Sequence, residues 1–563
     1  MPALPPPPPA LPPRAAASSV PSSSLVAQPK QLDPLSVWIT EGARIFLRII
    51  CPADAPAVIY QKALQVLPGP RRTYAGAMEE GHGDDRISNL PNDILVNILD
   101  RLNVRQAVRT SILARRWSQL LADLPRLAIS VRDFLRPKSR MPDGEFRRIN
   151  TAVFEATKSM LARRDGCTIR LLSTEFFLRD DAPVSIGRTV ADAMATHKIE
   201  EAEFTVLTVK SRLRCTDDDR VNFGAQFASF FHTCPNAFAG LTRLYLENCS
   251  FAEPDFVSNI LGTCKQLKHI CFIDCDTKGF TELQIEHAEL TELLFVNCRF
   301  DKVQLKWLPR LTETYFESWD EELPLSFGHV PLLDVLTLKT TALSWHKMVN
   351  LSTLLSETPV RDLRLGFTSE KIWVQPECVT RRLASAFYRL KIVTLYNIPE
   401  DYDLTWTMFI LEAAPSLEEF HMLVMDHPCE MQMDEEKRRE ALYSEEKGVV
   451  WESANPNFKH HRLTKLIIFC FESKRYMARH VNRVMKAAVN LQDVYLYNRL
   501  TCKMCPREKI PTRFPKSEKQ RCSDTKIMTR DIERPARIHF LNPNEMSADH
   551  DVLIPRYFVF QQR

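Results

Sequence analysis

Glycine is scarce in this sequence, with 15 residues among 563, and no stretch gathers them into a loop. The chain also lacks G-x-S-x-G, a P-loop, G-x-G-x-x-G and H-E-x-x-H. These motifs hold nucleophiles, phosphates or zinc in common enzyme classes. The sequence therefore offers few residues that could form a phosphate-binding loop or a catalytic centre. The sequence predicts a protein that is not an enzyme and that binds no cofactor and no metal.

Long hydrophobic runs are missing as well. No window reaches the roughly 18 uninterrupted apolar residues of a membrane-spanning helix, and the run at 45–51 contains Arg48 and stops at Pro52. Lys and Arg exceed Asp and Glu by only four, 74 against 70, and both signs are mixed along the chain. Nucleic-acid-binding surfaces are usually concentrated and basic. These features predict a soluble protein whose partners include neither a membrane nor nucleic acid.

The 15 cysteines are an odd number and lie scattered in apolar runs, which indicates reduced thiols. The predicted compartment is the cytoplasm, the nucleus or both. Cys502 and Cys505 have the spacing of metal ligands, and Cys522 follows them. A structural zinc site normally needs four ligands, and no second close pair follows. Metal binding at Cys502 and Cys505 is left open as an alternative to an ordinary loop.

Residues 1–83 begin with a stretch rich in Pro, Ala and Ser, which favours a disordered extension. An organelle transit peptide is the alternative, because Met1–Lys30 contains no acidic residue. Arginine is sparse there, however, and Pro5–Pro9 prevent an amphipathic helix. We assign this extension no function.

Residues 84–130 predict a compact helical unit. Pro91 suits a first helical turn, and Asp93 places a carboxylate near the positive end of the helix dipole. Apolar side chains then recur with helical spacing on one broad face, at Ile94, Leu95, Ile98, Leu99 and Leu102. A second apolar set, which includes Val108 and Ile112, resumes this period before Pro125. A unit of about 40 residues cannot bury so much apolar surface alone, so the rest of the chain or a partner must cover part of it.

Residues 131–166 predict a linker and capping helix, because the apolar residues of 144–165 have helical spacing. Leucine-rich repeats follow over 167–500. Three copies fit L-x-x-L-x-L-x-x-N/C, and they begin at Leu241, Leu267 and Leu290. Degenerate copies begin at Leu311, Leu332, Val360, Leu390, Leu417, Leu463 and Leu491. A charged segment at 426–457 is interpreted as an exposed insertion, with a target-contacting loop as the alternative, and 501–563 form a C-terminal tail.

Each repeat predicts a short strand. Its first, fourth and sixth positions point into a shared core, and the small ninth residue lies in a turn where it satisfies backbone groups. The predicted fold class is α/β: a small all-α unit, then an irregular solenoid with parallel strands on the concave face and helices and loops on the convex face. Residues that alternate outward line the concave face. We predict that a target binds there through Tyr245, Glu247, Phe295 and Tyr315.

Several short motifs of the helical unit, taken together, closely resemble the plant F-box. They are Leu90-Pro91, the Ile-Leu pairs at 94–95 and 98–99, Val108-Arg109-Thr110-Ser111 and Arg115-Arg116-Trp117. With the repeats and the segments at 513–516 and 536–540, residues 84–540 resemble grass-type F-box proteins with C-terminal leucine-rich repeats, the F-box/LRR (FBD-like) family.

This resemblance implies a non-catalytic, substrate-recognition subunit of an SCF-type (cullin-RING) E3 ubiquitin ligase. Its F-box would bind a Skp-family adaptor, and its repeats would bind a target protein for ubiquitination. The expected adaptor-binding residues are Leu90, Pro91, Ile94, Leu95, Ile98, Leu99, Leu102, Val108 and Ile112. Two alternatives stay open: a repeat scaffold that recruits no ligase, and a small-molecule sensor like the plant auxin and jasmonate receptors, which this architecture resembles. The sequence identifies neither the target nor a ligand.

Overall fold

The chain forms two compact units, 1–91 and 92–563. The computed structural model describes residues 90–545, with gaps at 112–114, 136–141, 165–167, 280–281, 320, 341–345, 357, 368–371, 379–380, 426–450, 452–454, 456 and 501–512. The predicted disordered extension therefore lies outside the described residues, as do most of the charged insertion and the pair Cys502 and Cys505. Within the described part, no helix has both the length and the apolar character needed to cross a membrane.

Three short helices open the second unit: α3 (Asn92–Asp100), α4 (Val104–Ser111) and α5 (Arg115–Leu120). α3 begins at Asn92, one residue after Pro91, which was predicted to lie in the first turn, and it carries Asp93 in its first turn as predicted. The side-chain oxygen of Asn103 accepts a hydrogen bond from the backbone N–H of Gln106 at 2.8 Å. Asn103 therefore caps the start of α4, since it satisfies one of the N–H groups that a helix start leaves unpaired.

A strand and a helix connect these three helices to the repeats. β1 (Arg126–Ile129) is followed by the 3-10 turn η1 (Val131–Phe134) and by α6 (Asp143–Leu161). The position of α6 confirms the helix predicted at 144–165. β1 pairs in parallel with β2 (Ile169–Phe177), so the sheet begins before residue 167, where the repeats were predicted to start.

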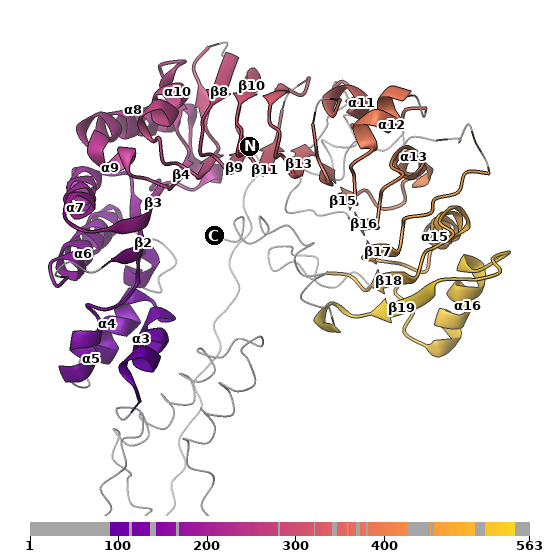
Figure 1. Ribbon diagram of the computed structural model, residues 1–563, viewed down its shortest axis with the longest axis horizontal. Helices are drawn as coiled ribbons and strands as arrows, with labels where there is room; N and C mark the ends of the chain where they lie inside the picture. Colours follow the sequence, from indigo (N-terminus) through magenta and orange to yellow (C-terminus); the bar gives the residue numbers. More distant parts are fainter. Residues whose placement is uncertain are drawn as a thin grey trace, which may run out of the picture. The chain divides into compact units, whose positions relative to one another are not determined.

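Fourteen parallel strands form one sheet (Figure 1). This sheet confirms the predicted α/β fold with parallel strands. Each strand pairs with the next in the order β1, β2, β3 (Ile199–Leu207), β4 (Arg243–Glu247), β6 (His269–Ile273), β9 (Glu292–Val296), β11 (Glu313–Glu317), β13 (Val335–Thr340), β14 (Asp362–Phe367), β15 (Ile392–Ile398), β16 (Glu419–Val424), β17 (Lys465–Phe469), β18 (Asp493–Tyr497) and β19 (Arg537–Leu541).

The predicted repeat starts lie two residues before a strand, with one exception. Leu332 is 55% exposed, whereas Leu333 is fully buried, and β13 begins at Val335. The repeat therefore starts at Leu333, which corrects the predicted start by one residue. A shift of one residue moves every side chain of a strand to the opposite face, so the hydrophobic core selects Leu333.

Helices cover the outer side of the sheet (Figure 1). The outer helices are α7 (Ala182–Thr196), α8 (Asp217–Thr233), α9 (Pro235–Ala239), α10 (Phe256–Thr263), α11 (Leu351–Leu354), α12 (Arg381–Phe387), α13 (Met408–Ala413), α15 (Arg475–Ala487) and α16 (Glu518–Met528). The array also contains the short 3-10 turns η2 (Arg212–Arg214), η3 (Thr405–Thr407) and η4 (Pro543–Glu545).

In the middle of the array, strands replace these outer helices. β8 (Glu282–Glu286), β10 (Lys302–Trp307) and β12 (Leu325–His329) form a second parallel sheet, and β5 (Ser250–Phe251) pairs with β7 (Asp276–Thr277). The repeats that contain β8, β10 and β12 start at Leu267, Leu290 and Leu311, only 21 to 23 residues apart. A strand advances about 3.3 Å per residue and a helix only 1.5 Å, so a shorter repeat crosses the outer side as a strand.

A left-handed turn ends the best-defined repeats. Asn248, Asp274 and Asn297 have φ values of 54°, 51° and 53°, a conformation that Asn and Asp adopt more readily than most residues. The buried cysteine that follows each of them, at 249, 275 and 298, donates its thiol to nearby carbonyl groups. The Cys298 thiol, for example, lies 3.3 Å from the carbonyl oxygen of Phe272. These contacts confirm the predicted role of the ninth position.

Candidate functional site

The apolar residues predicted to contact the adaptor divide between the core and the surface of the α3–α5 unit. Leu95 and Leu99 are fully buried, so their expected place on a partner-facing surface is corrected. Residues four apart lie on one helical face, and the face that carries these two leucines packs inward. Ile94 is 42% exposed, and Ile98 and Leu102 are half-buried. The part of α3 that is accessible at the surface is thus the strip that contains Ile94 and Ile98.

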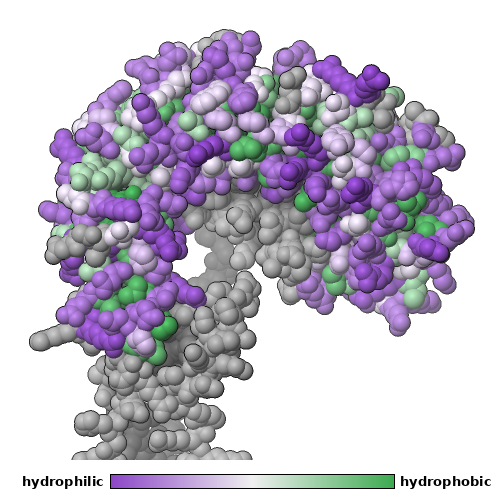
Figure 2. All heavy atoms as spheres, in the orientation of Figure 1, coloured by the Kyte–Doolittle hydropathy of each residue, from purple (hydrophilic) through white to green (hydrophobic). Residues whose placement is uncertain are grey.

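Val108 on α4 is 38% exposed. In the first unit, Leu90 is half-buried and Pro91 is exposed, while Ile112 lies outside the described residues. Figure 2 shows hydrophobic residues at the surface of the α3–α5 region among hydrophilic ones. The role of all these residues in adaptor binding stays a prediction.

Buried and partly buried hydrogen bonds hold the α3–α5 unit to the segments that flank the first strands of the sheet. Arg164, which follows α6, is only 4% exposed, and its guanidinium donates to the carbonyl oxygens of Leu124 at 2.6 Å and Leu121 at 3.4 Å. The guanidinium of Arg105 on α4 donates to the carbonyl oxygen of Asp133 at 3.0 Å. The helical unit therefore has a fixed attachment to the repeat array.

We expect Arg164→Ala to lower the free energy of unfolding by about 2–3 kcal/mol, because the carbonyl groups of Leu121 and Leu124 lose a charged donor in a buried site. Arg163→Ala is the matched control, since Arg163 is exposed and surface substitutions usually change stability by less than about 0.5 kcal/mol. Urea denaturation followed by circular dichroism measures both changes. Equal effects of the two variants would contradict the attachment.

The strand register aligns one outward residue per strand in a continuous row across the concave face. We call this row the middle rung. It contains Thr205, Tyr245, Cys271, Leu294, Tyr315, Thr337, Arg364, Thr394, His421, Ile467, Tyr495 and His539. Tyr245 and Tyr315 both belong to it and are three strand spacings apart, or about 14 Å. Glu247 lies on the same face, two residues beyond Tyr245.

Phe295 is a core residue, which corrects its predicted place on the concave face. Its side chain is fully buried, and its ring is stacked with that of Phe272 at a centroid distance of 5.7 Å and an interplanar angle of 8°. Phe295 occupies the sixth position of the repeat that begins at Leu290, and this position points inward. The outward neighbours in the same strand are Leu294 and Val296.

Glu247 is a carboxylate held in a largely buried environment at the end of β4. It accepts hydrogen bonds from the backbone N–H of Thr208 at 2.8 Å and from the Thr208 hydroxyl at 3.2 Å. Burial raises the pKa of Glu247 to about 7, although the bonds from Thr208 lower it. The nearby carboxylates of Asp274 and Glu175 raise the pKa further.

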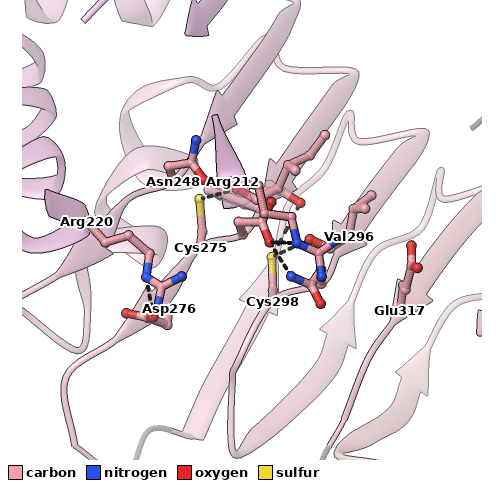
Figure 3. Close-up of polar contacts among 12 residues, drawn as sticks. Arg212, Arg220, Asn248, Cys275, Asp276, Val296, Cys298 and Glu317 are labelled. Carbon is pink, nitrogen blue, oxygen red and sulfur yellow. Dashed lines mark hydrogen bonds and ion pairs between the residues drawn. The ribbon is translucent and has the colours of Figure 1, made fainter. Parts of the chain in front are cut away.

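Figure 3 shows charged side chains from several elements of this part of the array, including Arg212, Arg220, Asp276 and Glu317. Arg212 lies 3.0 Å from Asp274. Burial raises the pKa of Asp274, and the positive charge of Arg212 opposes this effect. The Tyr315 hydroxyl donates to Glu317 at 2.6 Å, and Glu317 pairs with Lys339 at 3.1 Å. The concave face over β4–β13 therefore carries charged side chains of both signs beside apolar ones such as Leu294, and Tyr315 and Glu317 are buried there, at 2% and 8% exposed.

An apolar part of the concave face was not predicted from the sequence. We call it the apolar concave cluster, and it consists of Tyr396, Leu423, Met425, Ile467, Phe469, Cys470 and Tyr497, which are all buried. A signal was present, because residues 466–471 form an apolar run without alternation. Such a run indicates a strand that is covered on both faces.

The thiols of the described residues are free, and most of them are buried. Burial raises the pKa of Cys264 and of Cys470 to about 12, so both stay protonated and unreactive at neutral pH. Cys522 is exposed. Over the described part of the chain, no group of three or more His, Cys, Asp or Glu side chains is arranged to hold a metal ion.

Two family models match this chain. One is described as the LRR domain of At1g61320/AtMIF1 and matches residues 227–533, and the other is the F-box domain and matches residues 87–128. The first match covers β4 to β18 and most of the outer elements between them. The second covers the α3–α5 unit and ends near the end of β1.

Curated proteins of Arabidopsis thaliana are similar over parts of the chain. Putative F-box/LRR-repeat protein At5g54820 is 22% identical over 285 residues, which are 45% of this chain and 58% of that protein. F-box/LRR-repeat protein At3g03360 is 25% identical over 253 residues, 43% and 49% of the two chains. F-box protein At3g59150 is 34% identical over 104 residues, 16% and 22%. This chain thus spans less than two thirds of each of these relatives.

Proposed function

We propose that this chain, which belongs to the plant F-box/LRR-repeat family, is the target-recognition subunit of an SCF-type (cullin-RING) ubiquitin ligase. Its F-box, the α3–α5 unit, binds a Skp-family adaptor, and the concave face of the sheet binds a target protein. The relatives named above carry F-box and LRR repeats in their names, which supports this type of adaptor.

One observation carries the proposal. The α3–α5 unit buries Leu95, Leu99 and Trp117 in its own core, and it still exposes Ile94 and Val108. Isolated exposed apolar residues are common, but two of them on a unit of this family are the expected contact for a partner. The fixed attachment through Arg164 supports the same role, because a rigid link holds a target at a set distance from the adaptor.

The proposed role is positional and not catalytic. A target bound on the concave face experiences a high effective concentration of the ubiquitin-loaded conjugating enzyme, while the bond-forming groups belong to other subunits. The proposed compartment is the cytoplasm, the nucleus or both, where free thiols such as those of Cys249 and Cys275 stay reduced.

The double variant Ile94→Asp with Val108→Asp is expected to weaken binding of a recombinant Skp-family adaptor at least about 100-fold. Each buried Ile or Val contributes about 1.5–3 kcal/mol, and the two together exceed the 2.7 kcal/mol that corresponds to this factor. Isothermal titration calorimetry with the full chain measures the change.

Leu332→Asp is the matched control, because Leu332 is a 55% exposed apolar residue in the repeat array. It should bind the adaptor as the wild type does, and both variants should retain the wild-type circular dichroism spectrum. Wild-type affinity of the double variant would reject this docking surface. Failure of the wild-type chain to bind any Skp-family adaptor would favour the alternative of a repeat scaffold without ligase recruitment.

A further inference from the structure

The apolar concave cluster lies on the face of the sheet that points away from the helices. In β17, Leu466 and Ile468 point into the repeat core, so Ile467 and Phe469 point to the opposite face. Phe469 pairs with Leu423 of β16, and its ring is stacked with that of Tyr497 of β18 at 5.0 Å. The cluster is thus continuous across β16, β17 and β18.

This surface is buried, although among the described residues the hydrophobic side chains packed against it are the partly buried Tyr495, Leu500 and Leu541. Ile467 and Tyr497 have no exposed surface, and Phe469, Leu423 and Met425 are 3%, 4% and 5% exposed. The substantial contacts of β16–β18 among the described elements are with their neighbouring strands, and the helices occupy the other side of the sheet (Figure 1). Tyr245 and Ile273, on the same face of β4 and β6, are only half-buried, whereas Tyr315, Thr337 and Thr394, on β11, β13 and β15, are 2%, 4% and 2% exposed.

Three stretches of chain outside the described residues begin at this end of the array. Residues 426–450 follow β16, residues 501–512 follow β18, and residues 546–563 follow β19. Twelve of the 25 residues at 426–450 are charged, as are four of the 12 residues at 501–512. Residues 552–560, Val-Leu-Ile-Pro-Arg-Tyr-Phe-Val-Phe, contain seven apolar or aromatic residues and a single charge. Only the last segment has the composition to cover an apolar surface, because burying a charge without a partner is costly.

The C-terminal segment is also long enough to reach the cluster. Val552 follows Glu545, the last described residue, by seven positions, and an extended chain of seven residues spans up to about 23–25 Å. From β19 to β16 the distance is three strand spacings, about 14 Å. Neither a rearrangement of the sheet nor a second copy of the chain is needed for this contact.

We propose that residues 552–560 of the same chain dock on the apolar concave cluster. A tether of this length gives a millimolar effective concentration, so even weak contacts of the aromatic residues keep the site filled. The docking itself does not depend on recruitment of a ligase. If the concave face also binds the target of the proposed function, the target has to displace this segment from β16–β18, and affinity for the target is lowered accordingly.

Phe558→Ser with Phe560→Ser in the full chain tests the proposal, because it removes the two apolar rings from the segment and leaves the sheet unchanged. A fluorescent peptide of residues 550–563 is added in trans, and binding is followed by fluorescence anisotropy. The peptide should bind the double-serine chain at least 10-fold more tightly than the wild-type chain, whose site is already filled. A peptide that carries the same two serine substitutions is the control, and it should bind neither chain.

The site is mapped with a photo-crosslinking benzoylphenylalanine at position 558 of the full chain. Crosslinks to 396–425 and 467–497 within one chain support the proposal. Equal peptide affinity for both chains, binding of the control peptide, or crosslinks mainly to other regions or between two chains would overturn it. None of these outcomes depends on adaptor binding, so the proposal and the proposed function can fail separately.

Discussion

Replacement of Gly224 by alanine is expected to lower the free energy of unfolding by about 3 kcal/mol, the upper part of the range for overpacking. Gly224 lies in α8 against the short strand β5. An added Cβ would overlap the carbonyl oxygen of Ser250 and lie 2.7 Å from its carbonyl carbon. Backbone atoms cannot rotate away as the end of a side chain can. The substitution therefore pushes α8, with its buried Phe223 and Phe227, off the sheet.

The matched control is Gly262→Ala in α10. An added Cβ there meets nothing within 4 Å, so the substitution is expected to stabilise the protein by about 0.5–1 kcal/mol through the better helix propensity of alanine. Urea denaturation of the full chain, followed by circular dichroism, measures both variants. A Gly224→Ala variant as stable as Gly262→Ala would show that α8 and β5 do not approach as closely as described.

Glu247→Gln is expected to raise the free energy of unfolding at pH 8 by about 3 kcal/mol and to leave it nearly unchanged at pH 4.5. The pKa of Glu247 is about 7 in the folded protein against 4.5 for an ordinary glutamate, and this difference corresponds to about 3 kcal/mol. Between these two values the folded state retains a proton that the unfolded state has lost. Wild-type stability therefore falls as pH rises from 4.5 to 7, and the full cost is present above pH 7.

The same substitution at Glu419 should have the opposite sign. The hydrogen bond from His421, at 3.1 Å, and that from Lys465, at 2.7 Å, lower the pKa of Glu419 to about 2 despite its partial burial. A lowered pKa stabilises the folded state at pH values above 4.5, and this contribution is lost as pH falls toward 2. Glu419→Gln should thus destabilise the protein at pH 7, by roughly 1–3 kcal/mol.

Chemical denaturation of the wild type and both variants at intervals from pH 4.5 to 8 distinguishes these effects. The stability gain of Glu247→Gln should grow across this range and level off above pH 7, whereas Glu419→Gln should be less stable than the wild type at pH 7. A pH-independent gain for Glu247→Gln would mean that its carboxylate is ionised in the folded protein throughout this range. The same sign at both positions would contradict the different surroundings described for the two glutamates.

Much of the array could be predicted from the sequence because its signals are local. The spacing Leu241, Leu244, Leu246 placed β4 correctly, and the cysteine at the ninth position marked the turn after it. The start of α3 after Pro91 was equally predictable from helix-terminus preferences. Each of these signals involves residues within about ten positions of one another.

The binding surfaces were less predictable. Helical spacing grouped Leu95 and Leu99 with Ile94 and Ile98 on one broad face, and only packing against the rest of the unit buried the first two. Phe295 was placed on the concave face although its position in the repeat points inward. The apolar concave cluster was missed because it gathers side chains from strands that are up to about 100 residues apart in the chain.

The sequence by itself determined where most strands of the repeats begin. Local spacing suffices for this, because strand and helix periods are set by neighbouring residues. Only the tertiary structure decided which apolar residues of α3 stay exposed, how Arg164 joins the helices to the sheet, and which side chains form the rows of the concave face. Those outcomes depend on strand register and long-range packing, which bring together residues that are distant in the sequence.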